Sequence, residues 1–426
     1  MIFLNKNPKR QFTCFKNKLW IYGYSNYSHE DLYNKLENRD PPKDIRGQFA
    51  YVYIDNDYWI GCVDHYATTN LYYTKNKISD NLRDLIKDTD QLTDCKLWHE
   101  QKNIIKQFTV GELTRYNEIE QIMPEHYCIN TKQSRYMDLL NEDSISEPDP
   151  NKTLKCLERI FSHIHNLDPV VSFSGGKDSA FLAMALKHFG FNPRLVKVHS
   201  DNVKNLIDIN AAKDYENIGW NIEYLNVNNT RHFSKDTYWC EDTHWHAGQF
   251  SVKRHAVKDK GDIAMSGEVG GGYIVGDIVK YSHNYLASTN NPKIEDLVNI
   301  FTNATSSHFQ NTPSTIISNV EKNAGYHFIL NYFTEKWNRI DKDPYEKMLA
   351  FYRTEIASYR LWGESQDYDN TWFSLFSDPD LVKQWHYLSY KYKKKKNNMH
   401  DVAKLFSSYT DISWNYRITG MSIRGT

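Results

Sequence analysis

The string SGGKDS at residues 174–179 combines the residue types that hold a phosphate group. It follows the apolar run PVVSFS and leads directly into the helical pattern DSAFLAMALKHFG. Glycine lets a backbone approach a ligand that a Cβ would block, and a helix N-terminus presents N–H groups and a positive dipole to an anion. Ser174 and Ser179 add hydroxyl donors, and Lys177 adds a positive charge. These features predict a site for phosphate or pyrophosphate.

Asp178 is the acidic residue of this string, and it points to a metal ion. A carboxylate beside a phosphate is favourable when Mg²⁺ lies between the two. A plain glycine-rich turn with an aspartate near a helix start is the alternative interpretation. The junction of strand, turn and helix favours the nucleotide site. No GxxxxGK[ST] occurs in the chain, so the string is not a Walker P-loop.

The elements that position this string alternate between helix and strand after residue 152. LKCLERIFSHIHNL, DSAFLAMALKHFG and NLIDINAAKDYENIG are typical of helices, and PVVSFS, RLVKVHS and NIEYLNV are typical of strands. This alternation predicts an α/β domain with a doubly wound parallel sheet, which places ligands at the carboxyl ends of its strands. From about residue 344 the chain is predicted to be helical.

Residues 19–129 have a different pattern. Short aromatic and β-branched segments such as WIYGYS, QFAYVYI and YWIGCVD are separated by turn residues, as in antiparallel strands. A polar stretch with Pro148 and Pro150 follows and predicts a linker. We therefore expect an N-terminal domain of short strands over 1–140, a linker over 141–152 and an α/β domain over 153–426.

Composition excludes several classes of protein. The formal net charge of the 426 residues is −1, which gives no overall basic field for nucleic acid or an anionic membrane. No apolar run approaches the ~18 residues of a membrane span. The six cysteines are scattered without a Cys-x-x-Cys pair, which favours reduced thiols in a cytoplasmic protein. The expected partners are small molecules, and a homodimer stays open.

The string resembles the PP-loop of the ATP pyrophosphatases, and its surroundings resemble the asparagine synthetases. NLIDINAAKDYENIGWNIEYLNV at 205–227, KDKGDIAMSGEVGGGYIVGD at 258–277 and SDPDLVKQWHYLS at 377–389 follow one another in that family's order. RGQFAYVYID and GCVDHYATTNLYY resemble segments of its N-terminal domain. The resemblance implies an N-terminal α+β sandwich of glutaminase (Ntn-hydrolase) type, a PP-loop synthetase domain, and ATP and Mg²⁺ as cofactors.

The same resemblance implies the site residues. Nucleotide binding falls to Ser172, Ser174, Gly175, Gly176, Lys177, Asp178, Ser179, Val198, Ser266 and Gly267. Asp178 and Glu268 are the expected Mg²⁺ ligands and catalytic groups. The family's Asp-Glu is replaced here by Gly270-Gly271, so Glu268 is the nearest substitute and Asp277 the next.

A lysine that stabilises negative charge during amide formation is also expected. Lys404 is the assigned candidate, and Lys395 and Lys396 compete with it. His244 and His246 offer an alternative zinc site, but the spacing lacks the usual cysteine pairing. A pocket or structural role for these histidines is favoured.

The family's glutaminase nucleophile is not found. That family uses a cysteine directly after the initiator Met, whereas Ile2 follows Met1 here. Cys14 is expected to be a small buried residue, and the glutaminase is expected to be inactive. The predicted function is an ATP-dependent ligase that adenylates a carboxylate and forms an amide with ammonia or a substrate amine. β-Lactam synthetases and lasso-peptide cyclases resemble it in having an altered N-terminal domain without a working glutaminase. The alternatives are modification of a nucleobase or tRNA, and a nucleotide-binding protein without catalysis.

Overall fold

The computed structural model describes residues 2–3, 12–104, 109–137, 149–199, 206–226, 261–267, 293–296, 323–342, 347, 371–386 and 398–412. The chain divides into two compact units. The first unit comprises 1–143, 239–246 and 277–366, and the second comprises 144–238, 247–276 and 367–426. Within the described ranges, no helix is both long and apolar enough to span a membrane.

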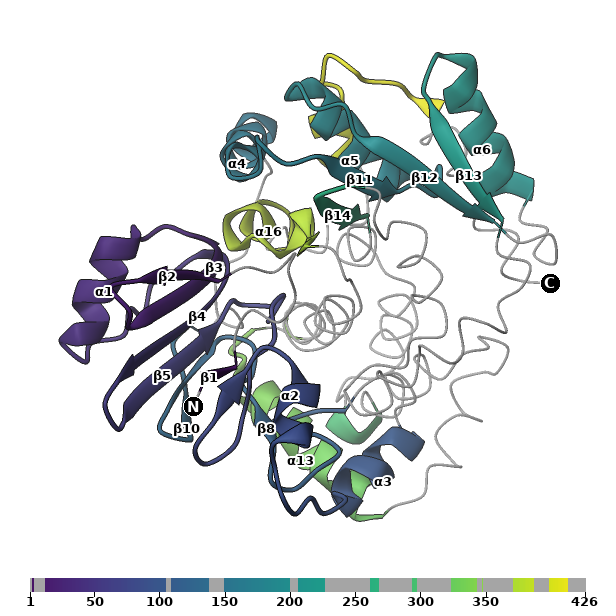
Figure 1. The fold of residues 1–426 in the computed structure, drawn as a ribbon. Coiled ribbons are helices and arrows are strands. Elements are labelled where there is room, and N and C mark those ends of the chain that lie inside the picture. Colours follow the sequence, from purple (N-terminus) through teal and green to yellow (C-terminus); the bar gives the residue numbers. More distant parts are fainter. Residues whose placement is uncertain are drawn as a thin grey trace. The chain divides into compact units, whose positions relative to one another are not determined.

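The first unit contains a six-stranded antiparallel sheet in the order β10-β9-β5-β4-β3-β2 (Figure 1). Its strands are β2 (Thr13–Phe15), β3 (Leu19–Ser25), β4 (Gly47–Asp55), β5 (Tyr58–Val63), β9 (His126–Ile129) and β10 (Lys132–Arg135). Helix α1 (His29–Glu37) covers one face of this sheet, because its buried Leu32, Tyr33 and Leu36 belong to the same apolar core as strands β3, β4 and β5. The side chain of Ser28 caps α1 by accepting the N–H of Asp31.

A smaller sheet packs against the opposite face. It has the order β1-β7-β6-β8, from β1 (Ile2–Phe3), β7 (Ile78–Ser79), β6 (Tyr72–Tyr73) and β8 (Glu120–Gln121). Ile60 and Cys62 of β5 face α1, so the residue between them, Gly61, faces the other way. A Cβ on Gly61 would lie 2.7 Å from Cδ1 of Ile78, so the two sheets approach closely at this glycine. The predicted N-terminal layered α+β arrangement is therefore present.

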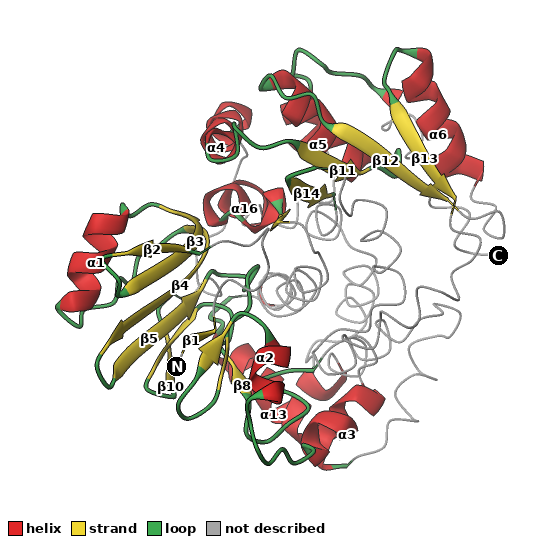
Figure 2. Cartoon of the chain, viewed as in Figure 1, coloured by secondary structure: helices red, strands yellow, loops and turns green. Residues whose placement is uncertain are grey.

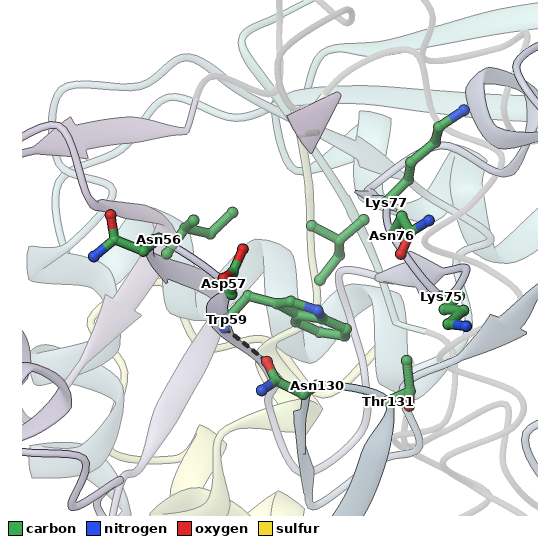
Figure 3. A pocket seen from close by; sticks show the side chains of 10 residues that line it. Asn56, Asp57, Trp59, Lys75, Asn76, Lys77, Asn130 and Thr131 are labelled. Atoms are coloured by element: carbon green, nitrogen blue, oxygen red, sulfur yellow. Dashed lines mark hydrogen bonds between the residues drawn. The ribbon is translucent and has the colours of Figure 1, made fainter.

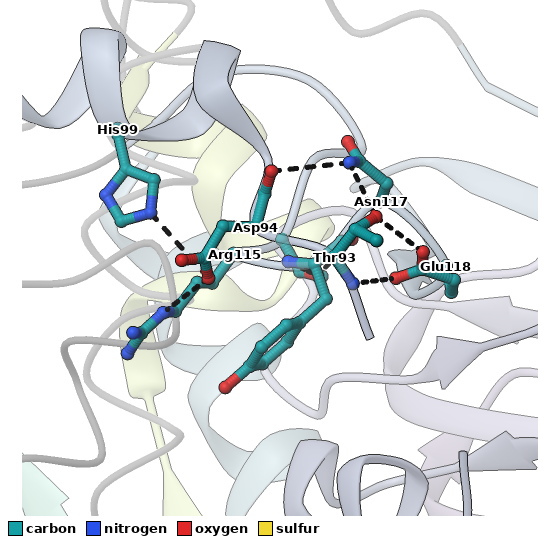
Figure 4. A network of polar contacts seen from close by, with 8 residues as sticks. Thr93, Asp94, His99, Arg115, Asn117 and Glu118 are labelled. Carbon is teal, nitrogen blue, oxygen red and sulfur yellow. Dashed lines mark hydrogen bonds and ion pairs between the residues drawn. The ribbon is translucent and has the colours of Figure 1, made fainter. Parts of the chain in front are cut away.

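Helices α2 (Leu82–Lys87), α3 (Lys96–Ile104) and α13 (Ala324–Arg339) complete the described part of the first unit. A polar network fastens the chain before α3 to the segment 115–118 (Figure 4). Thr93 donates its N–H and its hydroxyl to the carboxylate of Glu118, at 2.9 and 2.6 Å. Gly325 of α13 donates its N–H to Oε2 of Glu100 at 2.8 Å, and this joins two helices that are far apart in sequence.

The second unit contains a five-stranded parallel sheet in the order β13-β12-β11-β14-β15 (Figure 2). Its strands are β11 (Pro169–Ser172), β12 (Arg194–His199), β13 (Ile222–Asn226), β14 (Ile263–Ser266) and β15 (Thr371–Phe373). The chain runs outward from β11 to β13 and then returns to the other side of β11. This order is that of a doubly wound sheet, with its switch point between β11 and β14. The predicted parallel sheet is confirmed.

Among the described residues of the second unit, the helices are α4 (Pro150–Ser162), α5 (Lys177–His188), α6 (Leu206–Asn217), the short 3-10 helix η5 (Leu375–Ser377), α16 (Pro379–His386) and α18 (Asn398–Ala403). Helix α4 begins inside the predicted linker. Asp149 caps it by accepting the N–H groups of Asn151 and Lys152, and Pro150 occupies its first turn. Proline is favoured at that position because its missing N–H would have no partner within the helix.

Candidate functional site

The SGGKDS loop lies at the carboxyl end of β11 and ends in α5, as predicted. Gly175 has a φ of +85°, in the left-handed region that favours glycine. Gly176 precedes α5 in an extended conformation, with φ −73° and ψ 161°. From Ser179 to Leu186 every residue of α5 is buried. A helix buried on all sides holds its first turn firmly, and this fixes the position of the loop.

Two serines close the loop with a ring of hydrogen bonds. The N–H of Ser174 donates to Oγ of Ser179 at 3.1 Å, and the N–H of Gly176 donates to Oγ of Ser174 at 3.1 Å. The hydroxyl of Ser179 donates to the carbonyl of Gly176 at 3.1 Å. The sequence analysis assigned both hydroxyls as donors to a ligand, whereas in the structure both form hydrogen bonds within the loop. The amide N–H groups of Ser174 and Gly176 are likewise bound within the loop.

Lys197, which the sequence analysis did not single out, supports the loop from the neighbouring strand. Its Nζ donates to the carbonyl of Ser174 at 2.6 Å, and the residue is only 5% exposed. Strand β12 reaches this position because it pairs with β11 in parallel register, with Ser172 opposite Val196. The N–H of Phe173 continues this pairing by donating to the carbonyl of Val196 at 2.9 Å. The sequence did contain one indication of this role for Lys197. A parallel sheet is covered on both faces, so a lysine in one of its central strands needs a polar partner.

The segment after β14 meets the loop at the switch point. Ser266 is the register partner of Ser172. A Cβ on Gly267 would lie 2.5 Å from the backbone nitrogen of Ser179 and 2.6 Å from the carbonyl carbon of Asp178. Gly267 therefore rests directly on the first turn of α5, where a side chain would not fit. The structure brings the predicted residues 172–179, 266 and 267 together, and it places Val198 one residue before the end of β12.

Asp178 is the second residue of α5, and its Oδ1 atom is buried. A carboxylate in the first turn of a helix interacts favourably with the helix dipole, and it also suits a divalent cation. Among the described residues, no group of three or more His, Cys, Asp or Glu side chains forms a metal site. The expected second ligand, Glu268, lies outside the described residues, as do Asp277, His244 and His246.

The loop geometry suits the phosphate groups of a nucleotide. The first N–H groups of any α-helix lack carbonyl partners within the helix, and those of α5 lie beside the half-buried Lys177. A Cβ on Gly176 would lie 3.2 Å from Oγ of Ser174, so the backbone at this glycine has little room for a side chain. These features provide donors and positive charge for an anion.

The first residues of the segment 377–389 stabilise the start of α16. Asp378 is 1% exposed, and its Oδ1 accepts the N–H groups of Asp380 and Leu381 at 3.0 and 3.1 Å, which caps α16. A guanidinium nitrogen of Arg159, on α4, donates to the same oxygen at 2.8 Å. The ion pair and the cap hold α16 against α4 beside the sheet.

Lys404 directly follows α18, and its side chain is half exposed, with Nζ 3.7 Å from Asp401. The next residues pack along α5. Phe406 contacts the ring of Phe181, and the N–H of Ser407 donates to Nδ1 of His188 at 3.0 Å. Ser407 and His188 therefore meet at the end of α5 that is away from the loop. Lys395 and Lys396 lie outside the described residues.

Cys14 is exposed on β2, which corrects the expectation of a buried residue. It pairs with Trp20 of β3, and β2 is an edge strand of the six-stranded sheet. The chain before it is part of the fold, because Ile2 of β1 pairs with Ile78 of β7. A cleavage that made Cys14 the first residue would remove that strand.

A buried polar cluster follows β5, and the sequence did not indicate it. Asp64 is 0% exposed and accepts hydrogen bonds from three backbone N–H groups and from the hydroxyl of Thr68. Burial raises the pKa of Asp64 to about 6, although these hydrogen bonds oppose the rise. Burial lowers the pKa of the adjacent His65 to about 3, with a smaller contribution from Arg46. These groups organise the interior of the first unit.

A surface pocket of about 500 Å³ lies among hairpin turns of the first unit (Figure 3). Trp59 lies beside it, with its backbone N–H bound to Asn130 at 2.9 Å. The polar side chains around the pocket include Asn56, Asp57 and Lys75, which are exposed. Lys77 is already paired with Asp88 at 2.6 Å. The residues that line the pocket include no cysteine, serine or buried acid, so the SGGKDS loop is the stronger candidate for catalysis.

No model of a known protein family matches the sequence, and no curated protein matches it. The solved structures similar to the chain include one described as NMN synthetase from Francisella tularensis, with the likeness covering 51% of this chain and 97% of that one. The sequence identity is 11% and the TM-score is 0.22. A likeness this slight identifies neither the fold nor the reaction, so the functional argument depends on the loop and its neighbours.

Proposed function

We propose that the chain is an ATP-dependent ligase that adenylates a carboxylate and joins it to ammonia or a substrate amine, releasing AMP and pyrophosphate. The observation that carries this proposal is the SGGKDS loop at the switch point of a parallel sheet, closed by Ser174 and Ser179. Ligands of doubly wound sheets bind at that place. The resemblance to asparagine synthetases supplies the class of reaction.

The residues divide the work by position. The first turn of α5 and Lys177 hold the phosphate groups, and Ser172, Val198, Ser266 and Gly267 line the strand ends around the nucleotide. Asp178 and Glu268 would hold Mg²⁺, which would neutralise charge on the phosphates when bound. Lys404 remains our candidate for stabilising negative charge during amide formation. Positioning and charge stabilisation account for most of this chemistry.

We further propose that the first unit is of glutaminase type but hydrolyses no glutamine. Cys14 lies within an edge strand, and β1 precedes it as part of the fold. A nucleophile that needs a free α-amine does not fit this position. Free ammonia or an amine carried by the substrate is therefore the expected nitrogen source.

Pyrophosphate release tests the proposal. The protein is mixed with ATP, Mg²⁺ and a panel of carboxylic acids, with and without ammonia or amines, and both pyrophosphate and AMP are measured. We expect acid-dependent release that Asp178→Asn abolishes, because an amide cannot neutralise the metal. Release that is unchanged in Asp178→Asn would remove this residue from the mechanism. Release that requires a nucleobase or tRNA instead of a small acid would replace the proposed substrate class.

A second candidate function is nucleotide binding without turnover. It is favoured by Gly270-Gly271, which stand where the resembling family has its Asp-Glu. Tight binding of Mg·ATP with no pyrophosphate release, whichever acid is offered, would support this candidate over the ligase.

A further inference from the structure

We propose that the surface pocket of the first unit binds a neutral saccharide, with one sugar ring stacked on Trp59 and its hydroxyl groups bound by the surrounding hairpin turns (Figure 3). The pocket volume of about 500 Å³ is within the usual range of sites for small ligands. All the residues that line it belong to the first unit. The proposal therefore does not depend on the ligase reaction.

The pocket has an apolar floor and a polar rim. Ile78 is 2% exposed, and Ile54 and Trp59 are half-buried, so these three residues form the floor. The exposed residues of the rim come from three hairpin turns and include Asn56, Asp57, Lys75, Asn130 and Thr131. A pyranose ring carries C–H groups on its faces and hydroxyl groups around its edge. Its C–H groups suit the electron-rich face of an indole, and its hydroxyl groups suit amide and carboxylate side chains.

The charges around the pocket favour a neutral ligand. Asp57 and Lys75 carry opposite charges and lie on different turns, on either side of Trp59 in the view of Figure 3. Lys77 is paired with Asp88 at 2.6 Å. The lining therefore has no excess of positive charge to attract a phosphate group.

Trp59 is held in place before any ligand binds. Its ring contacts the ring of Tyr73, with the two centroids 5.8 Å apart, and Tyr73 is 2% exposed. Its backbone exchanges two hydrogen bonds with Asn130, to Oδ1 at 2.9 Å and from the N–H at 3.2 Å. A site that is ordered in advance loses less conformational freedom on binding.

The turn between β9 and β10 contains an unusual residue. Ile129 pairs with Lys132, so Asn130 and Thr131 form a two-residue turn, with φ values of +44° and +75°. Such a turn favours asparagine followed by glycine, and a β-branched residue rarely adopts a positive φ. Strained residues persist where they serve a function. Thr131 lines the pocket, so a contact with the ligand accounts for its presence.

The test is an NMR titration of the wild type with glucose, galactose, mannose, N-acetylglucosamine, maltose and lactose. The signal is the indole N–H of Trp59, assigned by its loss in Trp59→Phe. We expect at least one sugar to shift it saturably with a roughly millimolar Kd, as ordinary ligand efficiency gives for a ligand of about a dozen heavy atoms. Added NaCl should leave this Kd unchanged, because a neutral ligand has no charge to screen.

Thr131→Gly separates a role in binding from a role in the fold. Glycine relieves the turn, so the variant should be at least as stable in urea as the wild type, yet bind the sugar roughly 2- to 10-fold more weakly through loss of a hydrogen bond. Asn17→Gly is the matched control, because Asn17 is exposed with a φ of +55° in the turn between β2 and β3, outside the pocket. Its sugar affinity should equal that of the wild type.

Two results would overturn the proposal. The first is a Trp59 signal that none of the six sugars shifts, whether or not AMP or glycine shifts it, since a response to either of these alone would assign the pocket to a charged ligand. The second is a Thr131→Gly protein with the wild-type sugar affinity, because the strained threonine would then have no part in binding.

Discussion

Oγ of Ser174 lies 3.0 Å from Oγ of Ser179, across the turn that joins β11 to α5. Each hydroxyl also accepts an amide N–H of the loop, from Gly176 in one case and from Ser174 in the other. The turn is therefore held in shape before any ligand arrives. A loop ordered in advance loses less conformational freedom when it binds a ligand, and this favours affinity.

The two serines should differ in importance. Ser179 is 4% exposed, and its hydroxyl makes contacts with Ser174 and Gly176, whereas Ser174 is exposed. We expect Ser179→Ala to lower the free energy of unfolding by about 1–3 kcal/mol, because it leaves buried groups unsatisfied, and Ser174→Ala by about 0.5–1.5 kcal/mol. Both should weaken ATP binding.

The matched control for these variants is Ser162→Ala at the end of α4. Its hydroxyl donates to the carbonyl of Arg159 outside the loop, and its loss should leave ATP affinity unchanged. Urea denaturation and calorimetric titration with Mg·ATP measure both effects. A larger loss in Ser174→Ala than in Ser179→Ala would contradict this ranking.

Gly267→Ala tests the contact between β14 and α5. The new Cβ would lie within 3 Å of the backbone of residues 178 and 179. This backbone cannot move away easily, because α5 is buried on all sides from Ser179 to Leu186. We expect a loss of stability of about 1–3 kcal/mol and a clear loss of nucleotide affinity, measured by denaturation and titration.

Gly190→Ala is the comparison for Gly267→Ala. Gly190 has a φ of +86°, and no atom of the described chain lies within 4 Å of the place that a Cβ would occupy, so alanine there meets only backbone strain. Its cost should be about 1 kcal/mol with unchanged nucleotide affinity. Equal loss of affinity in the two variants would show that the contact at Gly267 does not shape the site.

Arg159→Met tests the connection between α4 and α16. The arginine pairs with the buried Asp378 at 2.8 Å and with Asp380 at 3.0 Å. Its side chain is 35% exposed, so solvent reduces the energy of the pair. We expect a loss of about 1–3 kcal/mol, because Asp378 keeps its two backbone donors. Asp378→Ala should cost more, since it removes the helix cap as well. The opposite order in a urea titration would be evidence against the cap.

Local patterns in the sequence predicted the parallel sheet and the loop, because alternating periods and glycines depend on neighbouring residues. The start of α4 was also predictable, because Asp149 followed by Pro150 is a typical beginning of a helix, although these residues were assigned to the linker. Lys197 and the loop meet only through the register of β11 and β12, which no local pattern encodes. Asp64 and His65 were missed because the local pattern indicates the wrong environment: a polar run such as DHYATTN ordinarily indicates an exposed turn, whereas here it is buried.

The acid sensitivity of the first unit provides the last prediction. His65 is buried, with Nδ1 3.1 Å from the hydroxyl of Tyr136, and burial lowers its pKa to about 3. An unfolded histidine titrates near pH 6.5. Between these values the unfolded chain binds a proton that the folded chain excludes. The free energy of unfolding therefore falls as the pH falls from about 6.5 towards 3, by up to ~1.4 kcal/mol per pH unit from this group.

Asp64 opposes this trend, because its folded pKa of about 6 lies above the unfolded value. Its contribution to stability is full below about pH 4 and is lost as the pH rises through 6.

The contribution of Asp64 is the same in wild type and in His65→Gln, provided that Asp64 keeps its hydrogen bonds. It therefore cancels when the free energies of unfolding of the two proteins are subtracted. We expect the stability of His65→Gln to depend less steeply on pH between 6.5 and 4. Tyr136→Phe, which removes the partner but keeps the imidazole, should be less stable at every pH and retain the wild-type slope. Hydrogen exchange of the β4 and β5 amides, corrected for its intrinsic pH dependence, measures the three slopes. Equal slopes in wild type and His65→Gln would show that His65 takes up its proton without unfolding.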